Sequence, residues 1–212
     1  MKQDEKIRLT IEAYDKDPQF FAEKFKGIGA RKADIDRAFD LNASKNNAVL
    51  ELGCGNGRDA EYILTKTDQY IGVDASSGLL DIAKKSLPNA DFRCEDMEKV
   101  DFSPNSFGVI FAFASFLHLP KESLGVMIEK CRQWLVEGGV LYVSVKHTNN
   151  YEEKMIDDEV APRYFYYYSA DDIKELARDF SVSYETLIKK GKTVWFEIAL
   201  KKVSHETSNR KA

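Results

Sequence analysis

The sequence of 212 residues lacks the features that mark secreted, membrane or metal-binding proteins. Its three cysteines, Cys54, Cys94 and Cys131, are odd in number and far apart, so they predict neither a disulfide framework nor a metal site. No apolar run approaches the ~20 residues of a membrane span. Residues 1–6 are too polar for the apolar core of a signal peptide. These absences favour a reduced, cytoplasmic setting with no membrane partner.

The sequence also lacks an excess of positive charge. It has 31 Lys and Arg against 35 Asp and Glu, a net charge of −4, so no basic field is present to attract nucleic acid. The apolar fraction of 43% is sufficient for a substantial core. The length suits a single domain, which we expect over residues 1–201.

The most informative stretch begins at residue 48. An apolar run at residues 48–52 predicts a buried parallel strand. Three glycines follow at alternate positions, Gly53, Gly55 and Gly57, and an amphipathic helix is predicted from Asp59 onward. A strand, a glycine turn and a helix open a nucleotide-binding βαβ unit, where glycines permit tight turns and close ligand contact. The helix N-terminus beyond them attracts negative groups.

The glycine spacing differs from that of the dinucleotide fingerprint. G-x-G-x-x-G would place a glycine at position 58, but this sequence has Arg58, which would crowd a pyrophosphate. Glu51 precedes the first glycine and can face an ammonium group. The stretch ELGCGNG resembles the first motif of class I S-adenosylmethionine-dependent methyltransferases, acidic-x-G-x-G-x-G. The resemblance implies that Glu51, the three glycines and Asn56 bind the cofactor S-adenosyl-L-methionine.

A second stretch, YIGVDAS, predicts a short strand that ends in Asp74. In nucleotide-binding folds an acid at the tip of the second strand accepts hydrogen bonds from both ribose hydroxyls. We therefore expect Asp74, with Ala75 beside it, to bind the ribose. The alternative is that Asp74 merely caps the next helix, although Ser76 or Ser77 could perform that task.

The end of the third predicted strand, residues 91–94, carries the next candidates. The resemblance implies that Asp96 lies near the adenine amino group and that Met97 packs against the ring. Ordinary core packing is the alternative for Met97.

The end of the fourth predicted strand is expected at the methionine part of the cofactor. The stretch ASFLHLP at residues 114–120 resembles the fourth motif of small-molecule methyltransferases. Phe113 and Phe116 could present their rings to a cation there, the first toward the cofactor and the second toward the acceptor. His118 is either a general base, since its ordinary pKa is near 6.5, or a residue that caps a helix or holds a loop.

Residues 1–45 are charged and helix-forming, and they predict a helical cap on the sheet. In related methyltransferases a tyrosine and other aromatic residues from such a segment often line the site. Tyr14, Phe20 and Phe21 are the candidates, with Tyr14 toward the cofactor and Phe20 toward the acceptor.

An unusual aromatic run with one arginine, RYFYYY, occupies residues 163–168. It is either an edge strand packed on the sheet or a wall of the acceptor pocket. In the second case Arg163 and Tyr167 would line that pocket.

The resemblance covers about residues 46–200 and implies an α/β fold. The expected architecture is a three-layer α/β/α sandwich with a Rossmann-like, seven-stranded sheet in the order 3-2-1-4-5-7-6, strand 7 being antiparallel. Residues 181–188 and 193–201 predict the hairpin at the antiparallel end. Residues 148–161 are interpreted as a polar insertion, and residues 202–212 as a disordered tail.

The reaction implied is in-line displacement of a methyl group from a sulfonium onto a small-molecule acceptor. The protein would mainly align the acceptor and desolvate the site. The same fold serves O-, N-, S- and C-methylation, so it does not identify the acceptor. Two alternatives remain: a protein that binds S-adenosylmethionine without catalysis, and a nicotinamide-dependent oxidoreductase, which Arg58 disfavours. We expect a monomer or a homodimer.

Overall fold

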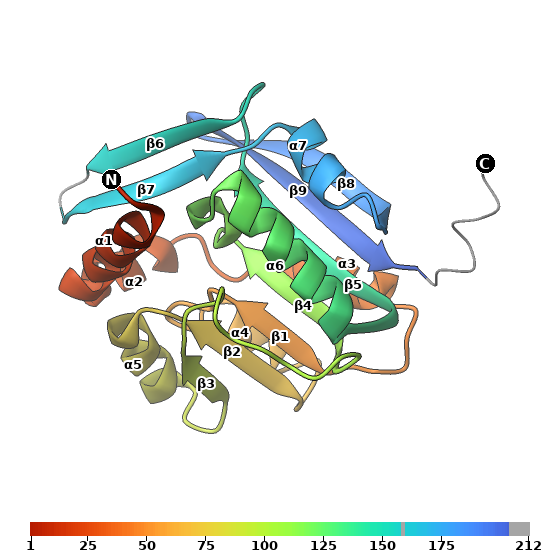
Figure 1. The fold of residues 1–212 in the computed structure, drawn as a ribbon. Helices are drawn as coiled ribbons and strands as arrows, with labels where there is room; N and C mark the ends of the chain where they lie inside the picture. The colour runs from red at the N-terminus through yellow and green to blue at the C-terminus, as the bar shows by residue number, and fades with distance from the viewer. Residues whose placement is uncertain (158–159, 204–212) are drawn as a thin grey trace.

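The computed structural model describes residues 1–157 and 160–203. Its central sheet consists of β1 (Val49–Leu52), β2 (Tyr70–Asp74), β3 (Asp91–Cys94), β4 (Phe107–Phe113), β5 (Leu135–Lys146), β8 (Phe180–Lys190) and β9 (Thr193–Lys202). The strand order is β3-β2-β1-β4-β5-β9-β8, and β9 runs antiparallel to both of its neighbours. This is the predicted order with the predicted antiparallel strand, so the expected fold is confirmed (Figure 1).

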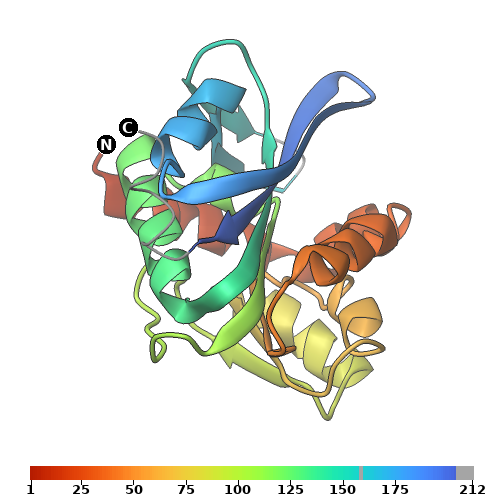
Figure 2. The same ribbon diagram turned by 90° about the vertical axis from the view of Figure 1, so that its right-hand side faces the viewer.

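Helices cover both faces of this sheet, which gives three layers (Figure 2). One face carries α3 (Lys32–Leu41), α4 (Ala60–Ile63) and α5 (Ser77–Ser86), and the other carries α6 (Lys121–Trp134) and α7 (Ala170–Leu176). All seven residues of β4 are buried because both faces of this central strand are covered. The helix α6 buries Leu124, Met127, Ile128 and Cys131, a spacing that forms one apolar stripe toward the sheet.

Two N-terminal helices, α1 (Gln3–Lys16) and α2 (Pro18–Lys26), lie near the carboxyl ends of the first strands (Figure 1). The Asp17 side chain caps α2 by accepting a hydrogen bond from the backbone N–H of Phe20, and a proline follows at the first turn. The predicted helical cap is therefore present, and α1 packs on both α5 and the aromatic run.

The aromatic run forms a strand, but not at the edge of the main sheet. It is β7 (Pro162–Tyr167), and it pairs antiparallel with β6 (Glu152–Asp157) in a separate two-stranded sheet. The expected polar insertion thus supplies a strand of its own. The prediction of an edge strand on the main sheet is wrong because β6 satisfies the backbone of β7, while β8 occupies the outer position beside β9.

Two further differences concern local lengths. The helix predicted from Asp59 is α4, which has one turn, because the backbone N–H groups of Thr65 and Lys66 bond three residues back and tighten the chain. The predicted hairpin is confirmed as β8 and β9. Of the expected disordered tail, residues 204–212 lie outside the described residues. Among the described residues, no helix combines the length and the apolar character needed to cross a membrane.

Candidate active site

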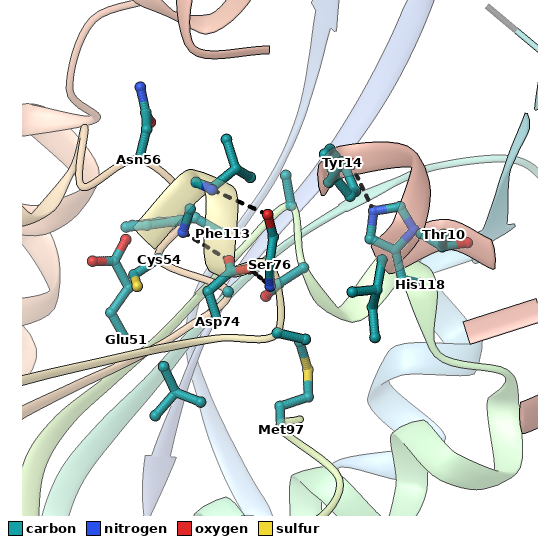
Figure 3. A pocket seen from close by; sticks show the side chains of 18 of the residues that line it. Thr10, Tyr14, Glu51, Cys54, Asn56, Asp74, Ser76, Met97, Phe113 and His118 are labelled. Carbon is teal, nitrogen blue, oxygen red and sulfur yellow. Dashed lines mark hydrogen bonds between the residues drawn. The ribbon is translucent and has the colours of Figure 1, made fainter. Parts of the chain in front are cut away.

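The ends of three adjacent strands meet at one cavity. Gly53 and Gly55 follow β1, Asp74 and Ala75 lie at the end of β2, and Phe113 ends β4; all of them line the cavity. Because β1 lies between β2 and β4, their carboxyl ends share one edge, which is where open α/β sheets bind ligands. Tyr14 of α1 closes the opposite wall (Figure 3).

The three glycines of the first motif have three different tasks. Gly53 has a φ of +77°, and a Cβ there would lie 2.3 Å from the Cβ of Ser115. Gly55 has a φ of +54° and lines the cavity, and a Cβ there would make only an ordinary contact with Leu79, at 3.9 Å. Gly57 has a φ of +76° and packs against α5 and β3, where a Cβ would lie 3.2 Å from Ala83. The structure thus places Gly57 outside the cavity lining, as part of the packing between helix and sheet.

The Asp74 carboxylate is held rigidly by backbone groups. Its Oδ2 accepts from the N–H of Gly55 at 2.8 Å, and its Oδ1 accepts from the N–H of Ser76 at 2.9 Å. Burial raises its pKa, and the two backbone N–H groups oppose that rise. Ser76, not Asp74, is the N-cap of α5, so the alternative of a simple capping role for Asp74 loses its support. The carboxylate retains lone pairs toward the cavity for a pair of hydroxyls.

A cluster of charged side chains, most of them buried, also lines the cavity. The Asp59 carboxylate accepts from the Arg31 guanidinium at 2.7 Å and from the Arg58 guanidinium at 2.6 Å. Burial opposes ionisation of Asp59, but the two arginines lower its pKa. Glu51, 2% exposed, accepts from the Tyr70 hydroxyl at 2.6 Å, and burial raises its pKa to about 8. The site can therefore present both cations and a carboxyl group to an amino-acid moiety.

Both arginines line the cavity, and sequence reasoning did not assign either of them to it. Arg31 lies at the start of α3, outside any motif, and its guanidinium lies 4.9 Å from the centre of the Phe113 ring. Arg58 was considered only as an obstacle to a pyrophosphate. Its position directly after the third glycine is the signal that could have indicated a role.

The loop after β3 forms another wall. Asp96 and Met97 line the cavity, as does Asn56 on the glycine turn. The Asp96 carboxylate accepts from the backbone N–H of Glu98 at 3.0 Å, which fixes the loop.

Tyr14 and His118 are hydrogen-bonded to each other at the cavity beside α1 (Figure 3), and Arg163 extends the pair to a chain of three side chains. The Nδ1 of His118 lies 2.8 Å from the carbonyl oxygen of Tyr164, which can only accept, so Nδ1 carries the proton. The Nε2 of His118 then accepts from the Tyr14 hydroxyl at 3.1 Å. The Nη1 of Arg163 donates to the same hydroxyl at 3.0 Å. Burial, with the charges of Arg163 and Lys146, lowers the pKa of His118 to about 4, so the ring is neutral near pH 7.

Four of the expected acceptor residues do not line the cavity. Phe116 is fully buried in the core on the α6 face, because the short 3₁₀ turn η1 (Phe116–His118) directs it away from the side of Phe113. Phe20 packs edge-on against Phe21 on the outer part of α2. Tyr167 of β7 has the ammonium groups of Lys146, from β5, and Lys154, from β6, over its ring. Arg163 is 5% exposed and reaches the cavity through Tyr14.

Apolar residues that were not predicted take their place. Phe25 and Ile28 from the region of α2, and Trp195 of β9, line the cavity. They belong to segments far apart in the chain, so no local pattern indicated them. In the described part of the chain, no group of three His, Cys, Asp or Glu side chains is arranged to hold a metal ion.

Comparisons with known proteins agree with this geometry. A family model described as a methyltransferase domain matches residues 49–139. Phosphoethanolamine N-methyltransferase of Plasmodium falciparum is 27% identical over 128 residues, which cover 58% of this chain and 48% of the relative. Ubiquinone biosynthesis O-methyltransferase of Coxiella burnetii is 29% identical over 109 residues, covering 50% and 46%. The chain thus spans about half the length of these relatives.

Solved structures share the fold at low sequence identity. The 1,6-didemethyltoxoflavin-N1-methyltransferase of Burkholderia thailandensis, solved with 1,6-didemethyltoxoflavin and S-adenosylhomocysteine, has a TM-score of 0.73 at 15% identity and covers 96% of this chain and 92% of that one. The [4+2]-cyclase SpnF has a TM-score of 0.70 at 14% identity, covering 91% and 95%. The family match over residues 49–139 and the solved structures show that this chain is similar to the class I S-adenosylmethionine-dependent methyltransferases in that segment and in its fold.

Proposed function

We propose that this protein transfers the methyl group of S-adenosylmethionine to a small-molecule acceptor bound beside Tyr14 and His118. Cofactor binding is supported by the cavity lining, which offers one matching group for each part of the molecule. Asp96 and Met97 would hold the adenine, Asp74 and Ala75 the ribose, Gly53, Gly55 and Asn56 the centre through the backbone, and Glu51, Arg31 and Arg58 the amino-acid end. Phe113 would lie near the sulfonium.

The methyl group moves by in-line displacement. The acceptor atom forms a bond to the methyl carbon, the carbon–sulfur bond breaks, and its electron pair returns to sulfur, leaving S-adenosylhomocysteine. An acceptor that carries a proton on the attacking atom loses it to the Tyr14–His118 pair. The Tyr14 oxygen can take that proton while its own passes to the Nε2 of His118, so the tyrosine stays neutral and the imidazole ends as an imidazolium, while the hydrogen bond from Arg163 positions the Tyr14 oxygen.

The observation that carries this proposal is the hydrogen bond between Tyr14 and the unprotonated Nε2 of His118 at the carboxyl edge of the sheet. A histidine that only caps a helix would not need, on its basic nitrogen, a tyrosine hydroxyl that a buried arginine holds in place. The low pKa of His118 limits its strength as a base in the free protein, so an acceptor that changes the local charge would use it best.

The cofactor half of the proposal is tested by calorimetry with S-adenosylhomocysteine. Asp74→Asn should weaken binding by about 1.5–3 kcal/mol, the range for hydrogen bonds to a charged group, which is about tenfold or more in Kd. Normal binding by Asp74→Asn would show that the ribose assignment is wrong, and tighter binding of NAD than of S-adenosylmethionine would contradict the methyltransferase proposal.

The catalytic half is tested by following S-adenosylhomocysteine release with a panel of small amines and phenols, phosphoethanolamine among them because of the relative named above. Tyr14→Phe and His118→Asn should reduce kcat by about 100-fold or more, the usual contribution of a positioned base, with cofactor affinity within a few-fold. Turnover equal to that of the parent in both variants would exclude the pair from catalysis. Cofactor binding without turnover on any acceptor would favour the non-catalytic alternative.

The expected partner and setting are also part of the proposal. The net charge of −4 supports a small molecule rather than nucleic acid as the partner. Cys54, Cys94 and Cys131 are all free thiols, which supports a reducing compartment such as the cytoplasm. Size-exclusion chromatography would distinguish the expected monomer from a homodimer.

A further inference from the structure

The side chains that line the cavity divide into a charged part and an apolar part. The carboxylates of the lining belong to Glu51, Asp59, Asp74 and the loop after β3, at residues 95–98. Among the described residues, no lysine lines the cavity, and its basic side chains are Arg31 and Arg58. Both donate to Asp59, at 2.7 and 2.6 Å. The charges of the lining are therefore either assigned to the cofactor or next to groups that are.

The apolar part of the lining comes from other elements. We call Phe25, Ile28, Leu119 and Trp195 the apolar wall; they belong to α2 and the turn after it, to the end of the turn that carries His118, and to β9. In the sheet, β2, β1, β4 and β5 stand between β9 and β3, so Trp195 lies far from the acidic loop after β3. Ile28 is 59% exposed although it lines a cavity, so it offers an apolar surface that a ligand can cover.

The helix α1 turns an apolar face to the same cavity. Ile7, Ile11 and Tyr14 line it, with the four- and three-residue spacing that places side chains on one face of a helix. Thr10 shares this face, but its hydroxyl already bonds two backbone groups. Of the residues of α1 only Thr10 and Ala13 are buried, so the side chains of Ile7 and Ile11 keep surface that a ligand can cover.

The hydrogen-bonding groups beside these apolar residues are neutral. His118, which is neutral near pH 7, bonds the Tyr14 hydroxyl. Ser115 lines the cavity and is 5% exposed, and its hydroxyl has no hydrogen-bond partner among the described residues. A ligand that reaches this hydroxyl removes the cost of an unsatisfied buried group. A base as weak as His118 needs a loosely held proton, and an aromatic hydroxyl, with a pKa of about 10, supplies one.

We infer that the acceptor is an uncharged aromatic molecule whose ring lies against the apolar wall and whose hydroxyl meets Tyr14. This inference rests on the proposed function, because it names the class of its acceptor. A charged group at this wall would lose its hydration without finding an opposite charge. The aromatic hydroxyl donates to the Tyr14 oxygen and gives up its proton there. Its own oxygen bonds the methyl carbon, and the electron pair of the breaking carbon–sulfur bond stays on sulfur.

The test measures the binding of three phenols to the full chain loaded with S-adenosylhomocysteine. The probes 4-ethylphenol, tyramine and 3-(4-hydroxyphenyl)propionate share one ring and one hydroxyl, and their other ends are uncharged, cationic and anionic in that order. In calorimetry, 4-ethylphenol should bind about tenfold or more tightly than either charged analogue, and phosphoethanolamine should bind more weakly still. Equal or tighter binding of a charged probe, or no measurable binding of 4-ethylphenol, would overturn the inference.

Ile28→Lys tests the position of the ring against the apolar wall. An ammonium group there should shift the ratio of the two affinities by about tenfold or more, away from 4-ethylphenol and toward the carboxylate probe. Val126→Lys is the matched control, because Val126 is also exposed, at 55%, but belongs to α6 and does not line the cavity. Its replacement should leave all affinities unchanged. The same ratio in Ile28→Lys as in the parent would overturn the inference. Binding of 4-ethylphenol as expected, without methyl transfer to it or to any other acceptor, would instead count against the proposed catalysis, so the two failures are distinguishable.

Discussion

At the scale of single residues, the glycine motif shows why one sequence pattern can contain several physical requirements. Gly53 needs both a left-handed backbone and the absence of a side chain, because Ser115 fills the adjacent space. Gly55 needs the left-handed backbone and leaves its surface to a ligand. The pattern G-x-G-x-G predicted a ligand site, but it could not separate these tasks, since they depend on what packs beside each glycine.

Gly53→Ala should therefore be strongly destabilising. A left-handed alanine costs about 1–2 kcal/mol, and forcing a methyl group into packed surroundings typically costs a further ~1–3 kcal/mol. Gly191→Ala is the matched control, because Gly191 also has a positive φ, +62°, but nothing lies within 4 Å of the added Cβ. Urea denaturation of both variants measures the difference. Equal losses of unfolding free energy would mean that Ser115 moves aside at no cost.

Glu51 predicts a pH dependence of stability. Its pKa in the folded protein is about 8, above the ordinary 4.5, so the folded state retains a proton that the unfolded chain loses. The contribution of Glu51 to stability is thus fully present below pH 4.5 and is lost as the pH rises toward 8. Glu51→Gln keeps an acceptor for the Tyr70 hydroxyl and has no proton to lose. Without cofactor, the free energy of unfolding of the Glu51→Gln variant, relative to that of the parent, should therefore rise from pH 5 to pH 8. Unfolding free energies that differ by a constant amount across this range would contradict the assignment.

At the scale of elements, α1 connects the two halves of the site. On one side Asp15 accepts from the Ser76 hydroxyl at 2.6 Å and from the N–H of Gly78 at 2.9 Å, at the start of α5. On the other side the Thr10 hydroxyl accepts from the backbone N–H of Tyr164 on β7 at 3.1 Å. Most of these contacts are hydrogen bonds, and only Thr10 and Ala13 of α1 are buried. Such an element opens more easily than the core does.

Asp15→Asn should loosen α1 without unfolding the protein. The substitution removes the charge that favours the N-terminus of α5 and weakens two hydrogen bonds, so amide exchange in α1 should accelerate while exchange in β4 and β5 stays slow. Hydrogen exchange followed by mass spectrometry measures both. Uniformly faster exchange throughout the sheet would show instead that α1 is part of the global folding unit.

The elements also show what the sequence could and could not predict. The strands β1, β2 and β4 were predictable because burial on both faces requires continuous apolar runs. The strand β6 was not, because its sequence, EEKMID, is largely polar and exposed and gains its structure only by pairing with β7. The glycine turn and Asp74 could be singled out because each belongs to a local motif, ELGCGNG and YIGVDAS. Arg31 and Trp195 enter the cavity through tertiary packing of distant segments, which leaves no local signal.

At the scale of the whole molecule, the groups that we assign to the cofactor and those on the acceptor side come from different parts of the fold. The half formed by β1, β2 and β3 carries the groups that we assign to the cofactor, and their spacing follows from one βαβ unit after another. The other side is completed by α1 and β9, which line the cavity from outside that repeating pattern, while β7 supports α1 without lining the cavity. The resemblance to the methyltransferase family could therefore be recognised from motifs, whereas the acceptor wall stays a prediction, and the four residues expected there do not line the cavity.

The contacts of α1 have a kinetic consequence. Because the same helix is bonded to α5 on one side and to β7 on the other, neither compartment can open widely while α1 stays in place. Entry of the cofactor and release of its demethylated product would then both require the same movement of α1. The turnover rate of such a protein is limited by how often α1 moves away from the cavity. If that movement is slower than methyl transfer, the first turnover is faster than the later ones, which wait for release of the product.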